Sequence, residues 1–262
     1  MKKQTDIFSV RDKVVIITGG AGVLGSEYAA YLSMAKAKVV VFDIKAEPFF
    51  PEEINVDYFQ VDITDKLAVL SAVSQVKKKY GYINVLINNA AMDAVPGSEF
   101  SKDQFLPYEH YPEALWEREL MVGITSALFC LQAVIPVMKL QGNGSVINIS
   151  STYGNVGPDN RIYGGEKYKS IAYASSKGAI LNFTRAWASY LRGSEIRVNT
   201  LTLGGVRADQ SEDFVLAYEN RTILGRMADK EDYNGAILFL ASEASRYMTG
   251  ANLVVDGGWT AW

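Results

Sequence analysis

The sequence predicts a doubly wound α/β fold, in which helices cover both faces of a parallel sheet. Three observations predict it. Seven short runs of apolar, often β-branched residues recur along the chain, segments with helical spacing separate most of them, and a glycine-dense turn follows the first run. Strands that alternate with helices form parallel sheets, because each connection has to cross back over the sheet. No repeat or linker divides the 262 residues, so we expect a single domain, 1–262.

The elements are expected in a regular order. Runs rich in Val, Ile or Leu predict strands at 14–17, 38–43, 57–62, 83–90, 144–151, 196–201 and 252–256. Apolar residues spaced three or four apart predict helices at 26–32, 65–80, 113–138, 171–191, 209–218 and 230–241. Open parallel sheets bind ligands at the carboxyl ends of their strands, and several of these strands end in polar residues. We therefore expect a binding site along that edge.

Composition and charge restrict the class of partner. Apolar residues make up 48% of the chain, charged residues 21%, and the formal net charge is −3. Apart from the short cluster 77–79, the chain has no basic run of the kind that nucleic acid or an anionic membrane requires. No stretch approaches ~20 apolar residues, and the amino terminus leads into no signal-like segment. We expect a cytoplasmic protein that binds neither nucleic acid nor membrane.

One cysteine and one histidine narrow the chemistry. Cys130 is the one cysteine, so an internal disulfide is impossible. Cys130 and His110 together supply too few ligands for a conventional Cys/His zinc site, so no metal is expected. Cys130 lies in an apolar helical segment and His110 in a loop-like stretch, which makes both ordinary structural residues. Proton transfer is left to Tyr, Lys, Ser or carboxylate groups.

The glycine-dense turn predicts a dinucleotide site. It runs from Thr18 to Gly25 between the first strand and a helix, and such a helix presents unpaired amides and a positive dipole end to a pyrophosphate. Asp43 ends the second strand about 20 residues beyond Gly25, where a carboxylate accepts hydrogen bonds from the adenosine ribose. A carboxylate there repels a 2′-phosphate, and neither Ala21 nor Ile44 offers a cation. We therefore expect NAD rather than NADP.

Tyr173 and Lys177 lie four residues apart, so they share one face of the helix predicted at 171–191. A tyrosine has an ordinary pKa of ~10, and proton exchange near neutral pH needs ~3 units, or ~4 kcal/mol, of phenolate stabilisation. A nearby lysine and an oxidised nicotinamide are able to supply it. Ser151 ends the preceding strand and offers a hydroxyl at the same edge. The alternative is a packing Tyr beside a solvated Lys, since this spacing is common in helices.

In combination, these motifs resemble the classical short-chain dehydrogenase/reductases over residues 10–262. The matching pieces are T-G-G-A-G-V-L-G (18–25), Asp62, N-N-A (88–90), N-I-S-S (148–151), Y-A-S-S-K (173–177), R-V-N (197–199) and V-D-G-G (255–258). The resemblance implies a single-domain Rossmann fold with a seven-stranded sheet, NAD(P)-dependent oxidation and reduction of CH–OH groups, and a homodimer or homotetramer.

The resemblance also implies roles for individual residues. Tyr173 is expected to be the general acid/base, Lys177 to lower its pKa and bind the nicotinamide ribose, and Ser151 to polarise the reacting carbonyl. The cofactor is expected to contact Gly19, Ala21, Gly22, Val23, Leu24, Gly25, Asp43, Asp62, Ile63, Asn89, Ala90, Tyr173, Lys177 and Val206.

Three positions depart from the family pattern. Val23 replaces the middle glycine of the phosphate loop, Gly123 an asparagine that holds a relay water, and Leu203 a proline before Gly204. We therefore expect a shifted phosphate loop, a different proton route to Lys177 through a backbone carbonyl and water, and a looser loop after Leu203.

The segment 152–169 is longer than in many members and is read as an insertion over the substrate. Its Asp, Arg, Tyr and Glu side chains (157–168) suit a hydroxylated or phosphorylated substrate, and an oligomer contact or surface flap is the alternative. This insertion and the ending 258–262 look similar to oxidoreductases of surface-glycan and flagellin-modification pathways, including legionaminic acid synthesis.

Three functions compete. The leading one is hydride transfer between NAD(H) and a secondary alcohol or ketone of a sugar-like small molecule. A 3-oxoacyl-type ketoreductase is disfavoured by the polar insertion and Asp43. A scaffold or sensor that binds NAD without turnover is suggested by Val23 and Gly123, and opposed by the intact Ser151, Tyr173 and Lys177.

Overall fold

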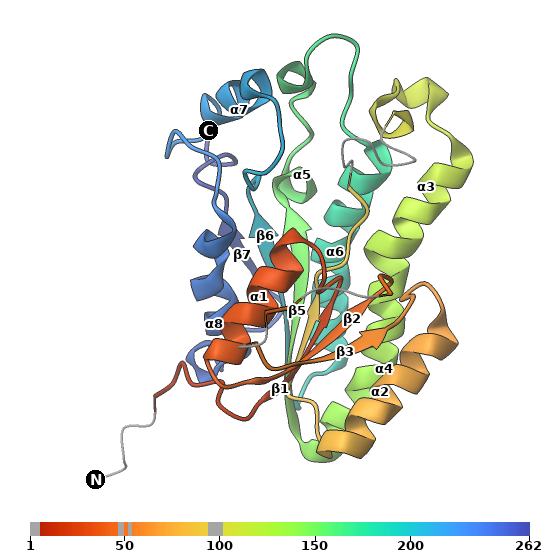
Figure 1. The fold of residues 1–262 in the computed structure, drawn as a ribbon, viewed down its shortest axis with the longest axis vertical. Coiled ribbons are helices and arrows are strands. Elements are labelled where there is room, and N and C mark those ends of the chain that lie inside the picture. The colour runs from red at the N-terminus through yellow and green to blue at the C-terminus, as the bar shows by residue number, and fades with distance from the viewer. Residues whose placement is uncertain (1–5, 47–49, 52–53, 94–101) are drawn as a thin grey trace.

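Seven parallel strands form one sheet in the order β3-β2-β1-β4-β5-β6-β7 (Figure 1). The computed structural model describes residues 6–46, 50–51, 54–93 and 102–262. The strands are β1 (Val14–Thr18), β2 (Lys38–Asp43), β3 (Val56–Gln60), β4 (Val85–Asn88), β5 (Asn143–Ser151), β6 (Glu195–Leu203) and β7 (Asn252–Val255). The strand order reverses between β1 and β4, which is where open parallel sheets bind ligands. The predicted doubly wound fold is confirmed.

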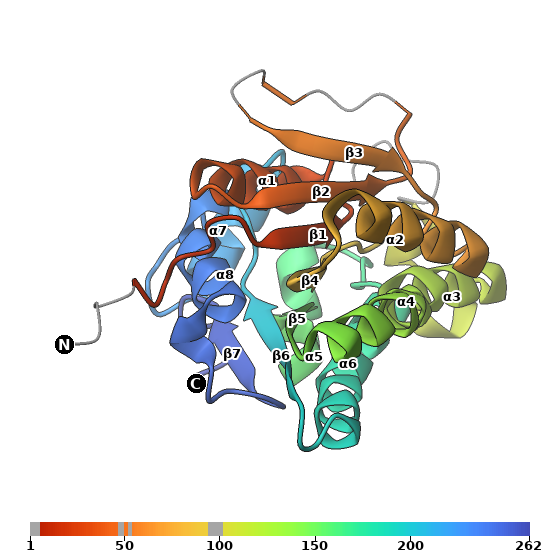
Figure 2. The same cartoon turned by 90° about the horizontal axis from the view of Figure 1, so that it is seen from below.

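Helices cover both faces of the sheet (Figure 2). One layer contains α1 (Val23–Met34) and α8 (Asn234–Ala241), and the other contains α2 (Lys66–Tyr80), α4 (Ser126–Gln141) and α6 (Ile171–Tyr190). Successive strand residues point to opposite layers: Ile16 packs with α2 and α4, and Ile17 with α1 and α8. Because both faces of the sheet are covered, central strands such as β1 and β4 are buried along their whole length and do not alternate between buried and exposed residues.

The helix predicted at 113–138 consists of α3 (Glu113–Leu120), a π-helical segment (Met121–Thr125) and α4. In the described part of the chain it is the one helix that is long and apolar enough to cross a membrane, so the expectation that no stretch reaches this length is wrong. The predicted helix as a whole does not read as apolar, because it begins with the charged residues of α3 and the apolar run comes only after them. Half of that run is buried, and α4 packs on the sheet and on α2, as a core helix of a globular fold does.

Two helices are shorter than predicted because local caps and turns delay them. α7 (Glu212–Glu219) begins after Ser211, whose hydroxyl accepts a hydrogen bond from the amide of Phe214. α8 follows a 3₁₀ turn at Lys230–Tyr233. The segment 152–169 begins with the one-turn helix α5 (Thr152–Asn155), and the chain beyond it arches over the carboxyl edge of the sheet before α6 (Figure 1).

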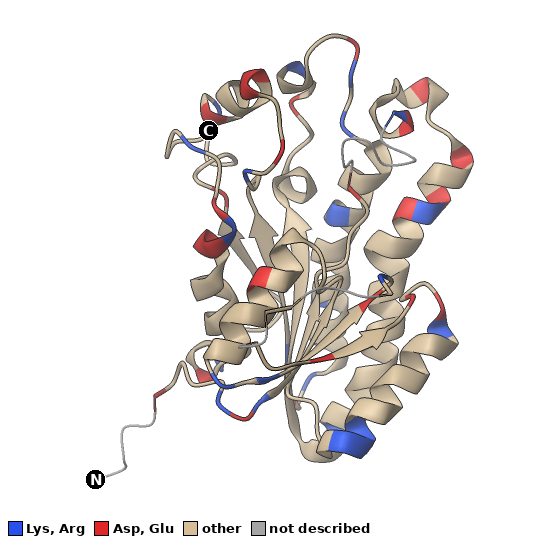
Figure 3. Cartoon of the chain, in the orientation of Figure 1, with Lys and Arg blue, Asp and Glu red and all other residues tan. Residues whose placement is uncertain are grey.

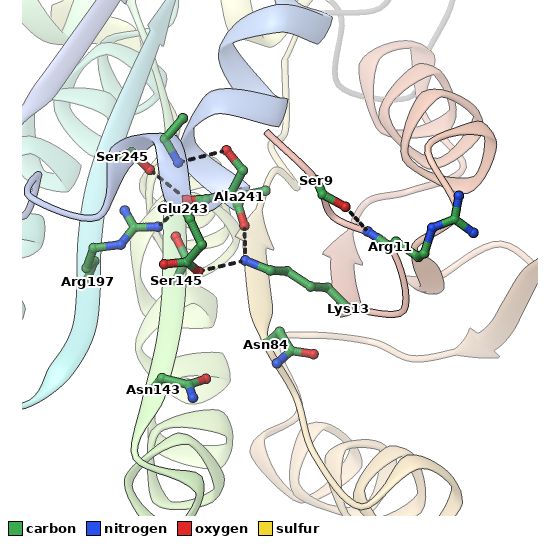
Figure 4. Close-up of polar contacts among 12 residues, drawn as sticks. Ser9, Arg11, Lys13, Asn84, Asn143, Ser145, Arg197, Ala241, Glu243 and Ser245 are labelled. Atoms are coloured by element: carbon green, nitrogen blue, oxygen red, sulfur yellow. Dashed lines mark hydrogen bonds and ion pairs between the residues drawn. The ribbon is translucent and has the colours of Figure 1, made fainter. Parts of the chain in front are cut away.

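The amino edge of the sheet is tied to the end of α8 by cationic side chains (Figure 4). Lys13 Nζ donates to the carbonyl of Ala241 at 3.1 Å and pairs with Glu243 at 3.2 Å. Arg197 donates to the carbonyl of Leu240 at 3.0 Å. The last carbonyls of a helix lack partners within it and carry partial negative charge, so cations stabilise them. The amino edge of the sheet is thus occupied by contacts that stabilise the fold, and the carboxyl edge is the one where a ligand can bind.

Charged residues lie mostly on helices and loops, outside the sheet (Figure 3). The cluster 77–79 is exposed in the last turn of α2, where positive charges interact favourably with the negative end of the helix dipole. His110 is exposed, and Cys130 is buried in α4, where burial raises the pKa of its thiol to about 12. Both residues are therefore ordinary structural groups, as expected.

Candidate active site

The carboxyl edge of the sheet opens into a cleft of about 1250 Å³. It extends from the turn after β1 to the segment 152–169 and the loop after β6. With the exception of Ala21, every predicted site residue lines it: Gly19, Gly22, Val23, Leu24, Gly25, Asp43, Asp62, Ile63, Asn89, Ala90, Ser151, Tyr173, Lys177 and Val206. Site residues that are spread along the chain from Gly19 to Val206 therefore converge on one cavity.

In the turn after β1 the backbone folds back on itself so tightly that positions 19 and 25 require glycine. Gly19 has φ +62°, and a Cβ on Gly25 would lie 2.2 Å from the carbonyl oxygen of Gly19. α1 then starts at Val23, whose side chain is 58% exposed, and its N-cap Gly22 provides no side-chain hydrogen bond. The strand, turn and helix remain intact with Val23 in place of glycine. The first amides of α1 are left for an anion in the cleft.

Asn89 holds this turn against β4. Its side-chain amide donates to the carbonyls of Thr18 and Gly19 at 3.1 and 3.2 Å. The Thr18 hydroxyl accepts from the backbone amides of Asn89 and Ala90 at 3.1 and 3.2 Å. Asn89 lines the cleft, but its polar atoms stabilise the phosphate turn.

Asp43 lies at the end of β2 with 8% of its surface exposed. Its carboxylate accepts from the backbone amides of Ala21, at 2.9 Å, and Lys45, at 3.1 Å. Lys45 Nζ donates to the carbonyl of Ala21 at 2.8 Å and also lines the cleft. The expectation that neither Ala21 nor Ile44 offers a cation is therefore incomplete, because the neighbouring Lys45 places an ammonium against the carbonyl of Ala21.

Ser151, Tyr173 and Lys177 meet at the other end of the cleft. Ser151 is the last residue of β5, and Tyr173 and Lys177 project from the first two turns of α6. Ser151 lies close enough to Tyr173 that its hydroxyl opposes the rise in the pKa of the Tyr173 phenol, and both side chains line the cleft. Lys177 Nζ donates to the carbonyl of Ile149 at 2.9 Å and lies 5.6 Å from the centre of the Tyr173 ring. The strand end and the helix face thus bring two hydroxyls and an ammonium together.

Electrostatics in the chain alone do not favour the phenolate. Burial raises the pKa of Tyr173, the Asp93 carboxylate raises it further, and the Ser151 hydroxyl opposes them. Burial also lowers the pKa of Lys177 to about 8. Burial and Asp93 therefore dominate the pKa of Tyr173 in the chain alone, and the expectation that Lys177, beside an oxidised nicotinamide, lowers this pKa stays a prediction.

Two charged residues that were not predicted lie beside Tyr173. Lys169 Nζ forms an ion pair with Asp93 and lies 4.4 Å from the centre of the Tyr173 ring and 5.9 Å from that of Tyr153. The Lys169 side chain is 8% exposed and that of Asp93 46%. Asp93 follows the polar end of β4, which is the one sequence signal for the pair. Both residues line the cleft.

A buried carboxylate positions the start of α6. Glu119 of α3 accepts hydrogen bonds from Gln104, from Tyr111 at 2.8 Å and from Ser170. Ser170 is the N-cap of α6, and its hydroxyl accepts from the amide of Tyr173 at 3.0 Å. Glu119 is 2% exposed. No sequence motif indicates this link, because its partners are distant in the chain.

Gly123 leaves no space for a side chain. It is buried in the π-helical segment, and a Cβ there would lie 2.6 Å from the hydroxyl oxygen of Ser176. That hydroxyl donates to the carbonyl of Tyr173 at 2.8 Å. Ser176 thus occupies the space that a side chain at position 123 would need, and the expected proton route through a backbone carbonyl and water stays a prediction.

One part of the segment 152–169 forms structural ion pairs, and another part lines the cleft. Asp159 is held by Arg161 at 2.7 Å and Arg221 at 3.3 Å, which makes it a structural link rather than a wall of the cleft. Tyr163 and Glu166 line the cleft, so this part of the expectation agrees with the geometry.

The chain after β6 is well supported. Leu203 completes the strand, and the amide of Gly204 donates to the carbonyl of Val255 at 3.0 Å, whereas the expected looser loop stays a prediction. Trp259 is 2% exposed and stacks on Tyr218 with ring centres 4.2 Å apart. Val206 continues the wall of the cleft through a bridge to Ala228.

Comparison with known proteins gives matches along the whole chain. The family profile described as Enoyl-(Acyl carrier protein) reductase matches residues 20–260. The trans-4-hydroxycyclohexanecarboxylate dehydrogenase of Sinomonas cyclohexanicum is 32% identical over 96% of this chain and 94% of that protein. The 3-oxoacyl-[acyl-carrier-protein] reductase of Thermotoga maritima is 32% identical over 94% and 97%. A probable galactose dehydrogenase of Rhizobium meliloti is 29% identical over 95% of each. These relatives do not support the surface-glycan subgroup, which stays a prediction.

Solved structures agree on the fold. A short-chain dehydrogenase from Leptospira borgpetersenii with bound NAD⁺ has a TM-score of 0.86 and 32% identity, over 96% of this chain and 94% of that one. A gluconate 5-dehydrogenase from Burkholderia cenocepacia, in complex with NADP and tartrate, has a TM-score of 0.86 and 25% identity over 98% of each. These two neighbours hold different cofactors, so they do not decide between NAD and NADP. The chain belongs to the short-chain dehydrogenase/reductase family of oxidoreductases.

Proposed function

We propose that this protein transfers a hydride between NAD(H) and a secondary alcohol or ketone of a sugar-derived small molecule. The observation that carries the proposal is the meeting of Ser151, Tyr173 and Lys177 in the same cleft as the phosphate turn. A buried phenol, a hydroxyl and an ammonium at the end of a cofactor-sized cleft are the groups that carbonyl reduction needs.

Each of these groups has a distinct role. Tyr173 gives its phenolic proton to the carbonyl oxygen during reduction and takes it back during oxidation. Ser151 donates a hydrogen bond to the same oxygen and stabilises its developing charge. Lys177 binds the nicotinamide ribose and contributes positive charge beside the phenolate.

The residues of the nucleotide end fit a dinucleotide. The first amides of α1 are suited to the pyrophosphate, the Asp43 carboxylate to the adenosine ribose, and Asp62 and Ile63 to the adenine. An oxidised nicotinamide, when bound, supplies the hydride acceptor and a positive charge. We propose NAD as the preferred cofactor, because the buried Asp43 carboxylate disfavours a 2′-phosphate, although Lys45 beside it moderates that preference.

The substrate proposal rests on the character of the far end of the cleft. Charged and hydroxyl-bearing groups gather there, including Asp93, Tyr163, Glu166 and Lys169, and this suits a hydroxylated molecule better than an acyl chain. The likeness to a probable galactose dehydrogenase supports this choice. The likeness to a 3-oxoacyl reductase supports the alternative ketoreductase. A scaffold that binds NAD without turnover is the remaining alternative.

The test compares the wild-type protein with Tyr173→Phe. We expect NADH and NADPH fluorescence titrations to show binding to both proteins, with NADH bound more tightly. Turnover of a panel of sugar alcohols, cyclic alcohols and 3-oxoacyl thioesters should fall about 10²–10⁴-fold in the variant, because the acid/base hydroxyl is lost. Undiminished turnover in Tyr173→Phe contradicts the proposal. Binding without any turnover by the wild type supports the scaffold alternative.

Assembly and location remain proposals that rest on the family resemblance. We propose a homodimer or homotetramer that uses α4 and α6, whose ends leave Leu140 and Tyr190 exposed at 80% and 66%. Analytical ultracentrifugation tests the assembly, and a monomer at micromolar concentration contradicts it. We further propose a cytoplasmic location and a role in carbohydrate metabolism, with surface-glycan precursors as one candidate substrate group.

A further inference from the structure

We propose that Asp93 and Lys169 are the specificity-determining pair of this enzyme. They bind a hydroxyl group on a carbon next to the reacting carbon, which makes the substrate an uncharged vicinal diol or the matching α-hydroxy ketone. The inference rests on the proposed function, because it takes Tyr173 as the group that meets the reacting oxygen.

The position of Lys169 carries the first step. Its Nζ lies 4.4 Å from the centre of the Tyr173 ring, and its ion-pair partner Asp93 lines the same cleft. When a substrate oxygen meets the Tyr173 hydroxyl, a substituent on the next carbon lies within a few ångströms of that hydroxyl. The pair therefore lies within reach of the neighbouring substituent.

The chemistry of the pair carries the second step. A hydroxyl group both donates and accepts a hydrogen bond, and the pair offers one acceptor, Asp93, beside one donor, Lys169. Charge-assisted hydrogen bonds of this kind are stronger than neutral ones. A carboxylate or phosphate on the substrate would meet Lys169 but would also lie against the negative charge of Asp93. The pair thus favours an uncharged hydroxyl over an anion.

The difference in burial between the two partners supports a ligand-binding role. The Lys169 side chain is 8% exposed, and its ammonium lies near the rings of both Tyr153 and Tyr173, whereas Asp93 keeps 46% exposure. The backbone amide of Lys169 is held by Asn160 at 2.9 Å, which fixes the approach of its side chain. Desolvating an ammonium is unfavourable, and an ion pair only partly offsets it. A preorganised donor beside a half-exposed acceptor is what recognition of a hydroxyl requires.

A second role for Lys169 makes a different prediction. If its charge acted only on the Tyr173 phenol, removing it would change turnover of every substrate alike. If the pair binds the neighbouring hydroxyl, removing either partner affects only substrates that carry it. Matched substrates that differ by one hydroxyl separate the two roles.

The experiment measures kcat/KM with saturating NAD⁺ for two matched pairs. These are trans-cyclohexane-1,2-diol against cyclohexanol, and D-galactose against 2-deoxy-D-galactose. We expect the wild type to favour the hydroxylated member at least tenfold. Asp93→Asn and Lys169→Met should each lower kcat/KM for that member about 10- to 100-fold, and change it less than threefold for the other. Lys78→Met, at an exposed lysine in the last turn of α2 and outside the cleft, is the matched control and should leave both values unchanged.

The other outcomes overturn the inference. Equal losses on both members of a pair would mean that Asp93 and Lys169 act on the phenol. A wild-type preference for trans-4-hydroxycyclohexanecarboxylate over the uncharged diol would also contradict it. Turnover of alcohols without any hydroxyl preference leaves the proposed function standing and removes this inference alone, whereas no turnover of any alcohol removes both. Should Lys169→Met fail to fold, as judged by its thermal melt, Asp93→Asn decides.

Discussion

The two ends of the cleft are held together in different ways. At the nucleotide end, the backbone supplies the architecture: Gly19 and Gly25 let the turn close on itself, and the first amides of α1 face the cavity. At the substrate end, side chains from distant segments supply it, as Lys169 does with Asp93 and Glu119 with Ser170. A backbone-built site tolerates change in side chains but not in backbone shape. A site built from side chains should respond in the opposite way.

The largest effect should follow a change in backbone shape at the nucleotide end. In Gly25→Ala the new Cβ would lie 2.2 Å from the Gly19 carbonyl oxygen, so the turn or α1 has to move. We expect NADH affinity to fall at least 100-fold and the free energy of unfolding to fall by about 1–3 kcal/mol. Fluorescence titration and urea denaturation measure the two effects.

Gly22→Ala is the matched control for this substitution. The backbone of Gly22 has φ −84°, and the nearest atom to its added Cβ is 3.3 Å away. Alanine fits there with little movement, so NADH affinity should change less than fivefold. Retention of NADH binding by Gly25→Ala within threefold of the wild type would show that the turn is not shape-limited.

This end of the cleft is also the part that the sequence predicts best. The residues from Thr18 to Gly25 are contiguous, so their spacing alone identifies a strand, a turn and a helix. The strands β1, β2 and β4 are predicted equally well, because they are buried on both faces and apolar along most of their length. Asp43 is predicted from its distance to the turn. Lys45 is not, because its contact with Ala21 depends on how the turn folds back.

The next largest effect should come from Glu119 at the substrate end. Glu119→Gln replaces one acceptor oxygen by an amide, which then faces the donors of Gln104, Tyr111 or Ser170. An unsatisfied buried group costs about 1–3 kcal/mol, so the melting temperature should fall by several degrees. Because Ser170 caps the helix that carries Tyr173, we expect kcat to fall about tenfold with KM little changed.

Two further variants separate positioning from general destabilisation. Glu117→Gln changes an exposed carboxylate on the same helix and should be silent in both measurements. Tyr111→Phe removes one of the hydroxyls that contact Glu119 and should give a smaller loss than Glu119→Gln. A lower melting temperature with an unchanged kcat would show that Glu119 serves stability alone.

The substrate end could be predicted only in part. Ser151, Tyr173 and Lys177 were predicted because a strand end and a four-residue helical spacing are local patterns. Glu119 was missed because a carboxylate inside a helix usually faces solvent, and only the packing of α3 against α6 buries it. Asp93 and Lys169 were missed as a pair because 76 residues separate them in the chain. Contacts between distant side chains leave no periodic signal in the sequence.

The smallest effect should distinguish the two charges at the ribose end. Lys45→Ala removes an exposed ammonium that donates to the Ala21 carbonyl. Exposed charge interactions contribute about 0.2–1 kcal/mol, so we expect NADPH affinity to fall about two- to fivefold while NADH affinity is unchanged. Lys78→Ala, at the exposed end of α2, is the control and should alter neither. An equal loss for both cofactors would instead mean that Lys45 braces the turn through the Ala21 carbonyl. In that case the cofactor preference would depend on the Asp43 carboxylate, and the turn would depend on Lys45 as well as on Asn89, two side-chain supports that lie outside its contiguous sequence.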